Sequence, residues 1–230
     1  MELFYAFPEN ISDNLLTLDS FEAKHLTKTL RKKTGDEIDI TDGEGNHFSG
    51  IIESLKPGLT VKISSKKKIK KDEQNLSLGI AFIRPNRLEF VLEKGTELGV
   101  GSFHIFRSEH ANYFSDNEKR FEKILRQAIK QSNRFWLPKL YLHKDFKSFI
   151  EKTNNIPLKL AAIDPNSPGI SSHFPINYTE ETLLSIGPEG GFSDKEIIVL
   201  KENGFKDVSL GKFRLRAETA AIAGVAKLIL

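Results

Sequence analysis

Near its C-terminus the chain reads Leu184-Ser185-Ile186-Gly187-Pro188-Glu189-Gly190-Gly191-Phe192-Ser193-Asp194-Lys195-Glu196. An apolar run over residues 182–186 gives way there to three glycines and a proline within five residues. Ser193 and Glu196 then have the spacing of a capping box, in which two side chains satisfy the free N–H groups at the start of a helix. The stretch therefore predicts a strand, a glycine-rich turn and a helix. Such a turn at the carboxyl end of a strand in an α/β sheet is a common place for a cofactor.

The glycine spacing of this turn excludes two nucleotide-binding motifs. A P-loop has Lys and then Ser or Thr directly after its final glycine, and Phe192 stands there instead. The dinucleotide fingerprint has glycines at its first, third and sixth positions, which Gly187, Gly190 and Gly191 do not match. Glu189 also places a carboxylate where a pyrophosphate would lie. The turn is therefore either a plain connection or a site for a neutral or cationic ligand, or for one bound through backbone groups around an adenine.

The composition is typical of a soluble globular protein with one large domain or two smaller ones. The 230 residues are 39% hydrophobic and 28% charged. Without an apolar run near the roughly 18 residues of a membrane helix, and without a secretory signal at the N-terminus, we expect a cytoplasmic protein with no membrane partner. The absence of cysteine excludes disulfides and thiolate catalysis, and the six histidines show no metal-ligand spacing, so no metal is expected.

Three basic clusters favour a polyanionic partner, although the formal net charge is only +3. Two are the short runs Arg31-Lys32-Lys33 and Lys66-Lys67-Lys68-Ile69-Lys70-Lys71. The third is the region 119–144, which holds eight Lys or Arg against the single acid Glu122. Each cluster alone is typical of a solvated face or a linker, but three in one chain favour RNA or another polyanion.

The first 70 residues predict a small β-rich domain. Residues 37–41 alternate apolar and polar side chains with the period of a strand, and residues 42–45 have the composition of a turn. Further strands are expected over 47–52 and 59–63, and a short helix over 20–31. Several short strands with one helix predict a compact barrel, after which the lysine run 66–71 predicts a linker to a second domain.

From about residue 75 strands alternate with helices, which predicts an α/β sheet. Strands are expected over 76–83, 100–106 and 158–163, and helices over 87–98 and 117–133, the latter with one apolar and one basic face. The last helix, which includes residues 217–226, is dominated by small residues, and this predicts close packing against backbone. The apolar end Leu228-Ile229-Leu230 predicts a buried C-terminus at a domain or dimer interface.

Two C-terminal motifs together resemble those of a known family. One is residues 186–193 with Glu196, and the other is Leu210-Gly211 followed by Leu215-Arg216-Ala217-Glu218-Thr219-Ala220. Both are similar to motifs of the RsmE family, which methylates N3 of a uridine in the 16S RNA of the small ribosomal subunit. Residues 93–100, 131–134 with Pro138, and 25–36 also resemble family motifs, so the resemblance covers nearly the whole chain in order.

The resemblance implies an α/β fold in two domains. Residues 1–72 would form a PUA-like β-barrel that binds RNA, and residues 73–230 a SPOUT-type knotted sheet domain with a C-terminal trefoil knot. It also implies S-adenosylmethionine as the cofactor, a homodimer, and small-subunit rRNA in an assembled or nearly assembled subunit as the substrate. Two other classes stay open: a non-catalytic RNA-binding factor with the same fold, and a transferase that binds another adenine-containing molecule.

The cofactor and RNA sites can be expected at specific positions. By resemblance, the cofactor would contact Ile186, Gly187, Pro188, Glu189, Gly190, Gly191, Leu210, Gly211, Leu215 and Thr219. RNA is expected on the cationic residues Arg31, Arg84, Arg87, Lys123, Arg126, Lys130 and Arg134. Phe135 and Trp136 would either stack a base or pack in the core.

The candidate catalytic residues are Arg216, Glu189 and Glu218. Arg216 could stabilise the negative charge that develops on the uracil carbonyl oxygens, or it could form an ion pair with either glutamate. Each glutamate is a candidate general base, while Glu189 is alternatively a brace of the glycine turn, so no base is assigned. Three departures from the family pattern bear on the RNA contacts: Lys130 where a glutamate is usual, Phe213 before Arg214, and His110 in the loop after strand 100–106.

Overall fold

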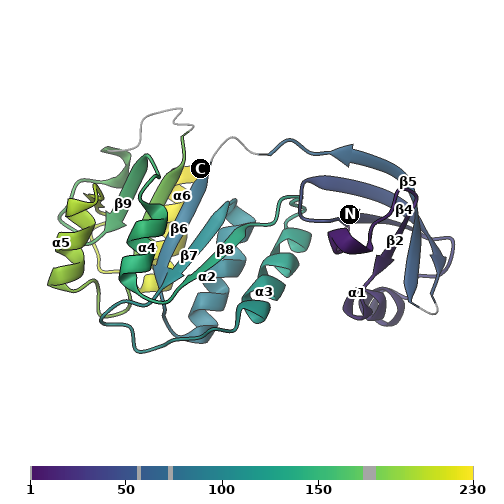
Figure 1. Cartoon of the computed structure of the whole chain (residues 1–230), viewed down its shortest axis with the longest axis horizontal. Coiled ribbons are helices and arrows are strands. Elements are labelled where there is room, and N and C mark those ends of the chain that lie inside the picture. Colours follow the sequence, from purple (N-terminus) through teal and green to yellow (C-terminus); the bar gives the residue numbers. More distant parts are fainter. Residues whose placement is uncertain (1, 56–57, 72–74, 173–179, 230) are drawn as a thin grey trace. The chain divides into compact units, whose positions relative to one another are not determined.

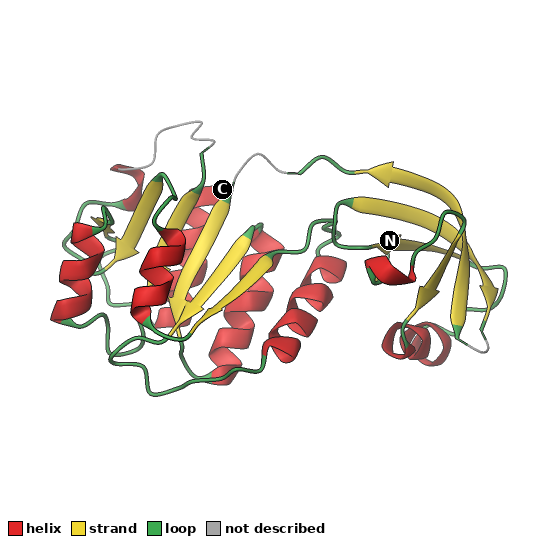
Figure 2. Cartoon of the chain, viewed as in Figure 1, coloured by secondary structure: helices red, strands yellow, loops and turns green. Residues whose placement is uncertain are grey.

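The structure is a computed structural model that describes residues 2–55, 58–71, 75–172 and 180–229. The chain forms two compact units, and the first consists of Met1–Lys71 together with Arg126–Leu137. The second consists of Asp72–Leu125 and Pro138–Leu230. Residues 126–137, from the middle of the chain, thus belong to the first unit. Figures 1 and 2 show the elements of both units.

The first unit is built on a five-stranded sheet. Its strands in spatial order are β1 (Leu3–Tyr5), β3 (Glu37–Thr41), β4 (Asn46–Ser54), β5 (Leu59–Lys68) and β2 (Leu15–Leu18). β1 runs parallel to β3, and the other pairs are antiparallel. Buried side chains from all five strands form its core, including Phe4, Leu16, Ile40, Phe48 and Leu59. The strands expected over 37–41, 47–52 and 59–63 are confirmed.

Two local expectations for the first unit are confirmed only in part. The expected helix 20–31 is α-helical only over α1 (Ser20–Lys24), since it widens into a π-helical turn, η2 (His25–Thr29). The lysine run 66–71 is not simply a linker, because β5 continues through Lys68. Lysine fits this strand because its long stem can lie along aromatic rings: the Lys66 ammonium lies 5.4 Å from the Phe48 ring centre.

Trp136 packs into the first unit. Its indole Nε1 donates to the Ile69 carbonyl at 3.1 Å, and the Lys68 ammonium lies 4.9 Å from its ring centre. The ring covers Gly45, where a Cβ would lie 2.3 Å from the indole carbons and where φ is +87°. Of the two uses that the sequence left open for Trp136, the structure supports packing.

The second unit is built on a six-stranded parallel sheet. Its strands in spatial order are β11 (Lys206–Val208), β9 (Leu158–Ala162), β10 (Thr182–Ile186), β6 (Leu76–Ala81), β7 (Ser102–Phe106) and β8 (Lys139–His143). The chain builds outward from β6 to β8, crosses to β9, and returns to insert β10 between β9 and β6. The order reverses at this point, which is where ligands bind in open α/β sheets.

Helices cover both faces of this sheet (Figure 1). α4 (Phe146–Thr153) and α5 (Asp194–Glu202) pack on one face through an aromatic cluster that includes Phe149 and Phe205. α2 (Pro85–Leu98) and α6 (Ala217–Ile229) pack together on the other face, where α6 contacts β6 and β10. α3 (Glu118–Gln131) is divided between the two units, because residues from Arg126 onward belong to the first.

The small residues of α6 allow the close packing that the sequence predicts. A Cβ on Gly224 would lie 2.4 Å from Cδ2 of Leu184 in β10, so only glycine fits there without a shift. Leu228 is buried, whereas Leu230 lies outside the described residues. Before α6 the chain is fastened to the loop after β9, since the Ser209 amide donates to the Pro168 carbonyl at 2.8 Å and the Ser209 carbonyl accepts from Ile170 at 3.3 Å.

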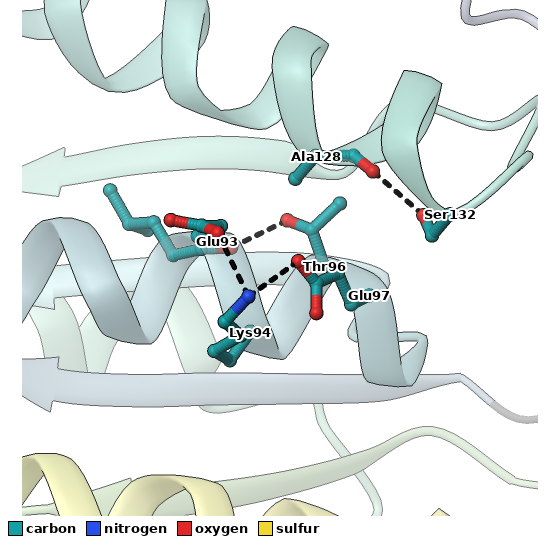
Figure 3. Close-up of polar contacts among 7 residues, drawn as sticks. Glu93, Lys94, Thr96, Glu97, Ala128 and Ser132 are labelled. Carbon is teal, nitrogen blue, oxygen red and sulfur yellow. Dashed lines mark hydrogen bonds and ion pairs between the residues drawn. The ribbon is translucent and has the colours of Figure 1, made fainter. Parts of the chain in front are cut away.

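The segment 93–100, which resembles a family motif, closes α2. Gly99 ends the helix with φ +112°, and a Cβ on Gly95 would lie 2.9 Å from the Phe103 ring. Lys94 Nζ donates to Glu93 and Glu97, each at 2.8 Å (Figure 3). These contacts explain the glycines and the charged residues of the segment by its structure. The same figure shows Ser132 Oγ, which donates to the Ala128 carbonyl at the end of α3.

A chain of buried polar side chains crosses β6, β7 and β8. Ser77 Oγ lies 2.7 Å from Ser102 Oγ, which lies 3.3 Å from His104 Nε2, and His104 Nδ1 lies 3.1 Å from His143 Nε2. Burial is the main reason that the pKa of His104 is lowered to about 3 and that of His143 to about 4, and the nearby Lys152 lowers both further. Both imidazoles are therefore neutral at pH 7.

Candidate functional site

A cavity of about 670 Å³ lies at the carboxyl ends of β9, β10 and β11. Its walls are the loop after β9, the glycine-rich loop after β10 and the connection from β11 to α6. The lining residues are 162–165, 186–192, 197, 208, 210–211, 213–217 and 220. Its volume is within the range of about 300–1,000 Å³ that is usual for small-molecule sites.

The glycine-rich loop has a backbone path that side chains would obstruct. A Cβ on Gly187 would lie 3.1 Å from the Phe192 amide nitrogen, because the loop doubles back on itself. Gly191 has φ +78°, and its amide donates to the Pro188 carbonyl at 2.9 Å to close the turn. The loop therefore brings peptide groups, rather than side chains, to the edge of the cavity.

The predicted capping box is present and does more than cap α5. Ser193 Oγ accepts from the Glu196 amide at 3.3 Å, and Glu196 Oε2 accepts from the Ser193 amide at 2.9 Å. The same buried carboxylate also accepts from Ser108 Oγ at 2.9 Å and from the Glu109 amide at 3.0 Å. It thereby ties the loop after β7 to the start of α5. His110 extends this contact, because its Nδ1 lies 3.2 Å from the Gly191 carbonyl oxygen.

Arg87, in the first turn of α2, joins two of the candidate catalytic carboxylates. Its Nη1 lies 3.8 Å from Glu189 Oε1, and its Nε lies 3.5 Å from Glu218 Oε1. Both Glu189 oxygens and Glu218 Oε2 are buried without a hydrogen bond in the described part of the chain. From the sequence, Arg216 was a candidate ion-pair partner of either glutamate, but in the structure the partner is Arg87. Arg216 is exposed and makes no ion pair with a described residue.

The predicted cofactor residues gather at one place with one exception. All of them line the cavity apart from Thr219, which is exposed on α6. Of the candidate catalytic residues, Arg216 and Glu189 line the cavity, and Glu218 is linked to it through Arg87. Sequence reasoning missed the wall formed by Asp164 and Pro165, although their position directly after an apolar strand was a usable signal.

The residues predicted to contact RNA have different environments. Arg31, Arg84 and Lys123 are exposed, and Arg126 is half-buried with its guanidinium 5.2 Å from the Phe7 ring centre. Lys130 does not fit the prediction, because it is buried and forms an ion pair with Glu22. Its ammonium is thus committed to the interior of the first unit. Arg134 is half-buried.

The described residues show neither a metal-ligand group nor a membrane-spanning helix. Among the described residues, no group of three or more His, Cys, Asp or Glu is arranged to hold a metal ion. The helices in the described ranges are also too short or too polar to cross a bilayer.

Comparisons with known proteins match both units. Residues 70–229 match a family model described as an RNA methyltransferase domain, and residues 18–64 match an RNA methyltransferase PUA domain. A curated relative, the ribosomal RNA small subunit methyltransferase E of Mesomycoplasma hyopneumoniae (strain 232), is 30% identical over 232 residues, which cover 99% of this chain and 99% of the relative.

Two solved structures are also similar along their full lengths. A methyltransferase from Legionella pneumophila, solved in complex with the bound cofactor SAM, has a TM-score of 0.89 at 29% identity, with 99% of this chain and 96% of that chain covered. A ribosomal RNA small subunit methyltransferase E from Neisseria gonorrhoeae, bound to S-adenosyl methionine, has a TM-score of 0.85 at 27% identity, with the same two coverages of 99% and 96%.

Proposed function

Because the chain belongs to the family of RNA methyltransferases with a PUA domain, we propose that it methylates N3 of a specific uridine in 16S ribosomal RNA, with S-adenosylmethionine as the methyl donor. The observation that supports this most directly is the cavity at the carboxyl ends of β9, β10 and β11. The glycine-rich loop 187–191 forms one of its walls. Relatives that cover the whole chain are named as small-subunit rRNA methyltransferases, and two similar structures hold the same donor.

The residues of the cavity fit S-adenosylmethionine. Ile186, Leu210 and Leu215 offer apolar contacts for an adenine, and the peptide groups of the loop 187–191 are accessible for hydrogen bonds. Glu189 also lines the cavity, with its buried carboxylate facing the Arg87 guanidinium. When bound, S-adenosylmethionine supplies a methyl group activated by a sulfonium centre.

The chain's own contribution is orientation and charge stabilisation. The cavity walls fix the positions of the two reactants, which can supply a large share of the rate enhancement. We assign to the Arg216 guanidinium the stabilisation of negative charge on the uracil oxygens as the N3 proton leaves. Two observations support this role. Arg216 is exposed and lines the cavity, and Glu189 and Glu218 form their ion pairs with Arg87 and not with Arg216.

RNA would contact exposed cations in each of the two units. Arg31 in the first unit and Arg84 and Lys123 in the second are suited to phosphate contacts. We leave Lys130 out of this surface because of its buried pair with Glu22. The substrate would be the small-subunit RNA within an assembled or nearly assembled subunit in the cytoplasm, and the target uridine would leave its stack to enter the cavity.

We also propose the PUA-like and SPOUT domain roles for the two units, a trefoil knot and a homodimer. The knot is supported by the pairing of Ser209 with residues 168–170 and by the packing of α6 against η3 (Ile170–Ser172). The chain between β11 and α6 thus lies against the loop after β9, as a threaded segment would. The dimer rests on the family resemblance, and sedimentation equilibrium of the full chain would test it.

The proposed activity can be tested in two steps. Calorimetry should first show binding of S-adenosylmethionine to the full-length protein. Labelled methyl transfer should then be measured to a 16S transcript and to small subunits from a strain without this protein, with mass mapping of the product. Binding without transfer to either RNA would favour the non-catalytic RNA-binding factor, and absence of binding would overturn the cofactor assignment. Methylation at an atom other than uridine N3 would overturn the assigned reaction.

A further inference from the structure

Phe213 is an aromatic side chain displayed at the candidate site. It is 81% exposed, which makes it the most exposed large hydrophobic residue in the described ranges. A single exposed phenylalanine on a protein surface needs no explanation. This one, however, also lines the cavity, together with Arg214 and Arg216 from the same connection between β11 and α6. Its ring therefore lies where a molecule entering the cavity would meet it.

The backbone on both sides of Phe213 is anchored. Before it, Ser209 pairs with residues 168–170, and Ser209 Oγ accepts from the Gly211 amide at 3.2 Å. After it, Arg214 Nη2 donates to the Glu189 carbonyl at 3.4 Å. The connection is thus fastened to the loop after β9 and to the glycine-rich loop. Between these anchors Phe213 is presented to solvent at a defined place.

The charges beside Phe213 indicate what the ring would bind. Lys212, Arg214 and Arg216 are all exposed and put three positive charges within residues 212–216. An aromatic face among cations is the combination with which proteins hold unpaired nucleic-acid bases, since the ring stacks on the base and the cations contact the phosphates. Because the three charges have the same sign, charge complementarity favours a polyanion, and we take RNA as the occupant.

We propose that Phe213 is the stacking platform for an unpaired nucleobase of the RNA substrate at the mouth of the cavity, with the Lys212 ammonium on an adjoining phosphate. The proposal rests on the proposed function, because it takes RNA as the substrate. Stacking does not read base edges, so Phe213 would contribute affinity and position rather than base identity.

The test uses direct RNA binding, so that it does not depend on catalysis. The full-length protein and the variants Phe213→Ala, Phe213→Trp and Phe213→Leu are titrated into a fluorescein-labelled 16S transcript at several salt concentrations. Phe213→Ala should weaken binding about 5- to 150-fold, which corresponds to about 1–3 kcal/mol per stacked base. Phe213→Trp should restore affinity, and Phe213→Leu should not. Calorimetry should give the same S-adenosylmethionine affinity for all four proteins.

Salt dependence separates the ring from the charge next to it. Phe213→Ala should leave the slope of log K against log salt unchanged, whereas Lys212→Ala should reduce its magnitude by about 0.7–0.9. Circular dichroism and sedimentation should show that each variant keeps the fold and oligomeric state. These measurements test the ring even if wild-type protein binds RNA without methylating it, an outcome that would defeat only the proposed reaction.

Four results would overturn the proposal. The first is wild-type RNA affinity in Phe213→Ala, and the second is no RNA binding by the wild type. The third is equal affinity of Phe213→Leu and wild type, because this would mean that apolar area and not a planar ring matters. The fourth is a loss of S-adenosylmethionine binding or a change of oligomeric state in Phe213→Ala, which would place the ring in the cofactor site or between copies of the chain.

Discussion

Lys130 and Glu22 form an ion pair in the interior of the first unit, although they are 108 residues apart in the sequence. Both side chains are buried, so each charge depends on the other for compensation. Lys130 belongs to the returning segment of the chain, and Glu22 belongs to the short helix α1. Because of this pair, Lys130 does not belong to the basic RNA-binding surface that was expected from the sequence.

Lys130→Ala should lower the free energy of unfolding by about 3–5 kcal/mol, because it leaves the Glu22 carboxylate buried without its partner. Urea unfolding followed by circular dichroism measures the change. Lys119→Ala, which removes an exposed lysine from the same helix, is the matched control and should lie within about 0.5 kcal/mol of wild type. Equal stability of the two variants would contradict a structural role for the pair.

Arg87→Met should reduce methyl transfer on the order of 100-fold, since Glu189 and Glu218 lose the cation that fixes them beside the cavity. Steady-state kinetics with 16S RNA would measure this. Lys94→Met is the control, because it removes a cation of the same helix that pairs with Glu93 and Glu97 instead. If Arg87→Met raised the KM for RNA and left kcat unchanged, Arg87 would be an RNA contact, as its sequence position first suggested.

Arg216→Ala should lower kcat by about 100- to 1,000-fold, the usual loss when a group that stabilises developing charge is removed. Binding of S-adenosylmethionine and the unfolding transition should stay as in the wild type. Lys227→Ala removes an exposed cation from the last turn of α6 and should change kcat little. Wild-type turnover of Arg216→Ala would remove Arg216 from the reaction.

Gly187→Ala should weaken binding of S-adenosylmethionine, because the new Cβ would lie 3.1 Å from the Phe192 amide nitrogen and displace the loop. We expect a loss of about tenfold or more in a calorimetric titration, equivalent to about 1.4 kcal/mol. Gly101→Ala makes the same chemical change where the nearest atom is 3.6 Å away, and it should bind like the wild type. Undiminished affinity in Gly187→Ala would show that the cofactor does not need this backbone path.

Stability should fall as the pH is lowered from about 6.5 toward 4. In the unfolded chain His104 and His143 take up protons near their ordinary pKa of 6.5, whereas burial holds their pKa values at about 3 and 4 in the fold. The unfolded state then binds more protons, so unfolding becomes more favourable with acid. Urea titrations at several pH values should show a flatter dependence for His104→Gln, while His110→Gln, at an exposed site, should follow the wild type.

The sequence predicted elements best where one local pattern was sufficient. Strand β10, its glycine turn and the Ser193 capping box were recognisable because the strand, the glycines and the capping residues all lie between Thr182 and Glu196. The order of the strands was not recognisable, because insertion of β10 between β9 and β6 depends on contacts between distant segments. The family resemblance, not periodicity, supplied the RNA methyltransferase domain that the comparisons support.

Long-range charge pairing was the main reason that the roles of residues in the candidate site could not be predicted from the sequence. Arg87 and Lys130 looked alike in sequence, as cations on amphipathic helices, yet each faces carboxylates from elements about 100 residues away or more. A helix pattern gives the face on which a side chain lies but not what covers that face. For the same reason Arg216 could not be separated from its proposed glutamate partners until the position of Arg87 was known.

The carboxylate of Glu196 has a consequence for how the protein forms during synthesis. Ser108 and Glu109 leave the ribosome 87 or 88 residues before the side chain that holds them. The loop after β7 therefore cannot take its final place until α5 has been made and has started to fold. A nascent chain that ends before α5 would contain the glycine-rich turn, but the loop after β7 would still lack the Glu196 carboxylate that holds it. Completion of the site is in this sense a late event of biosynthesis.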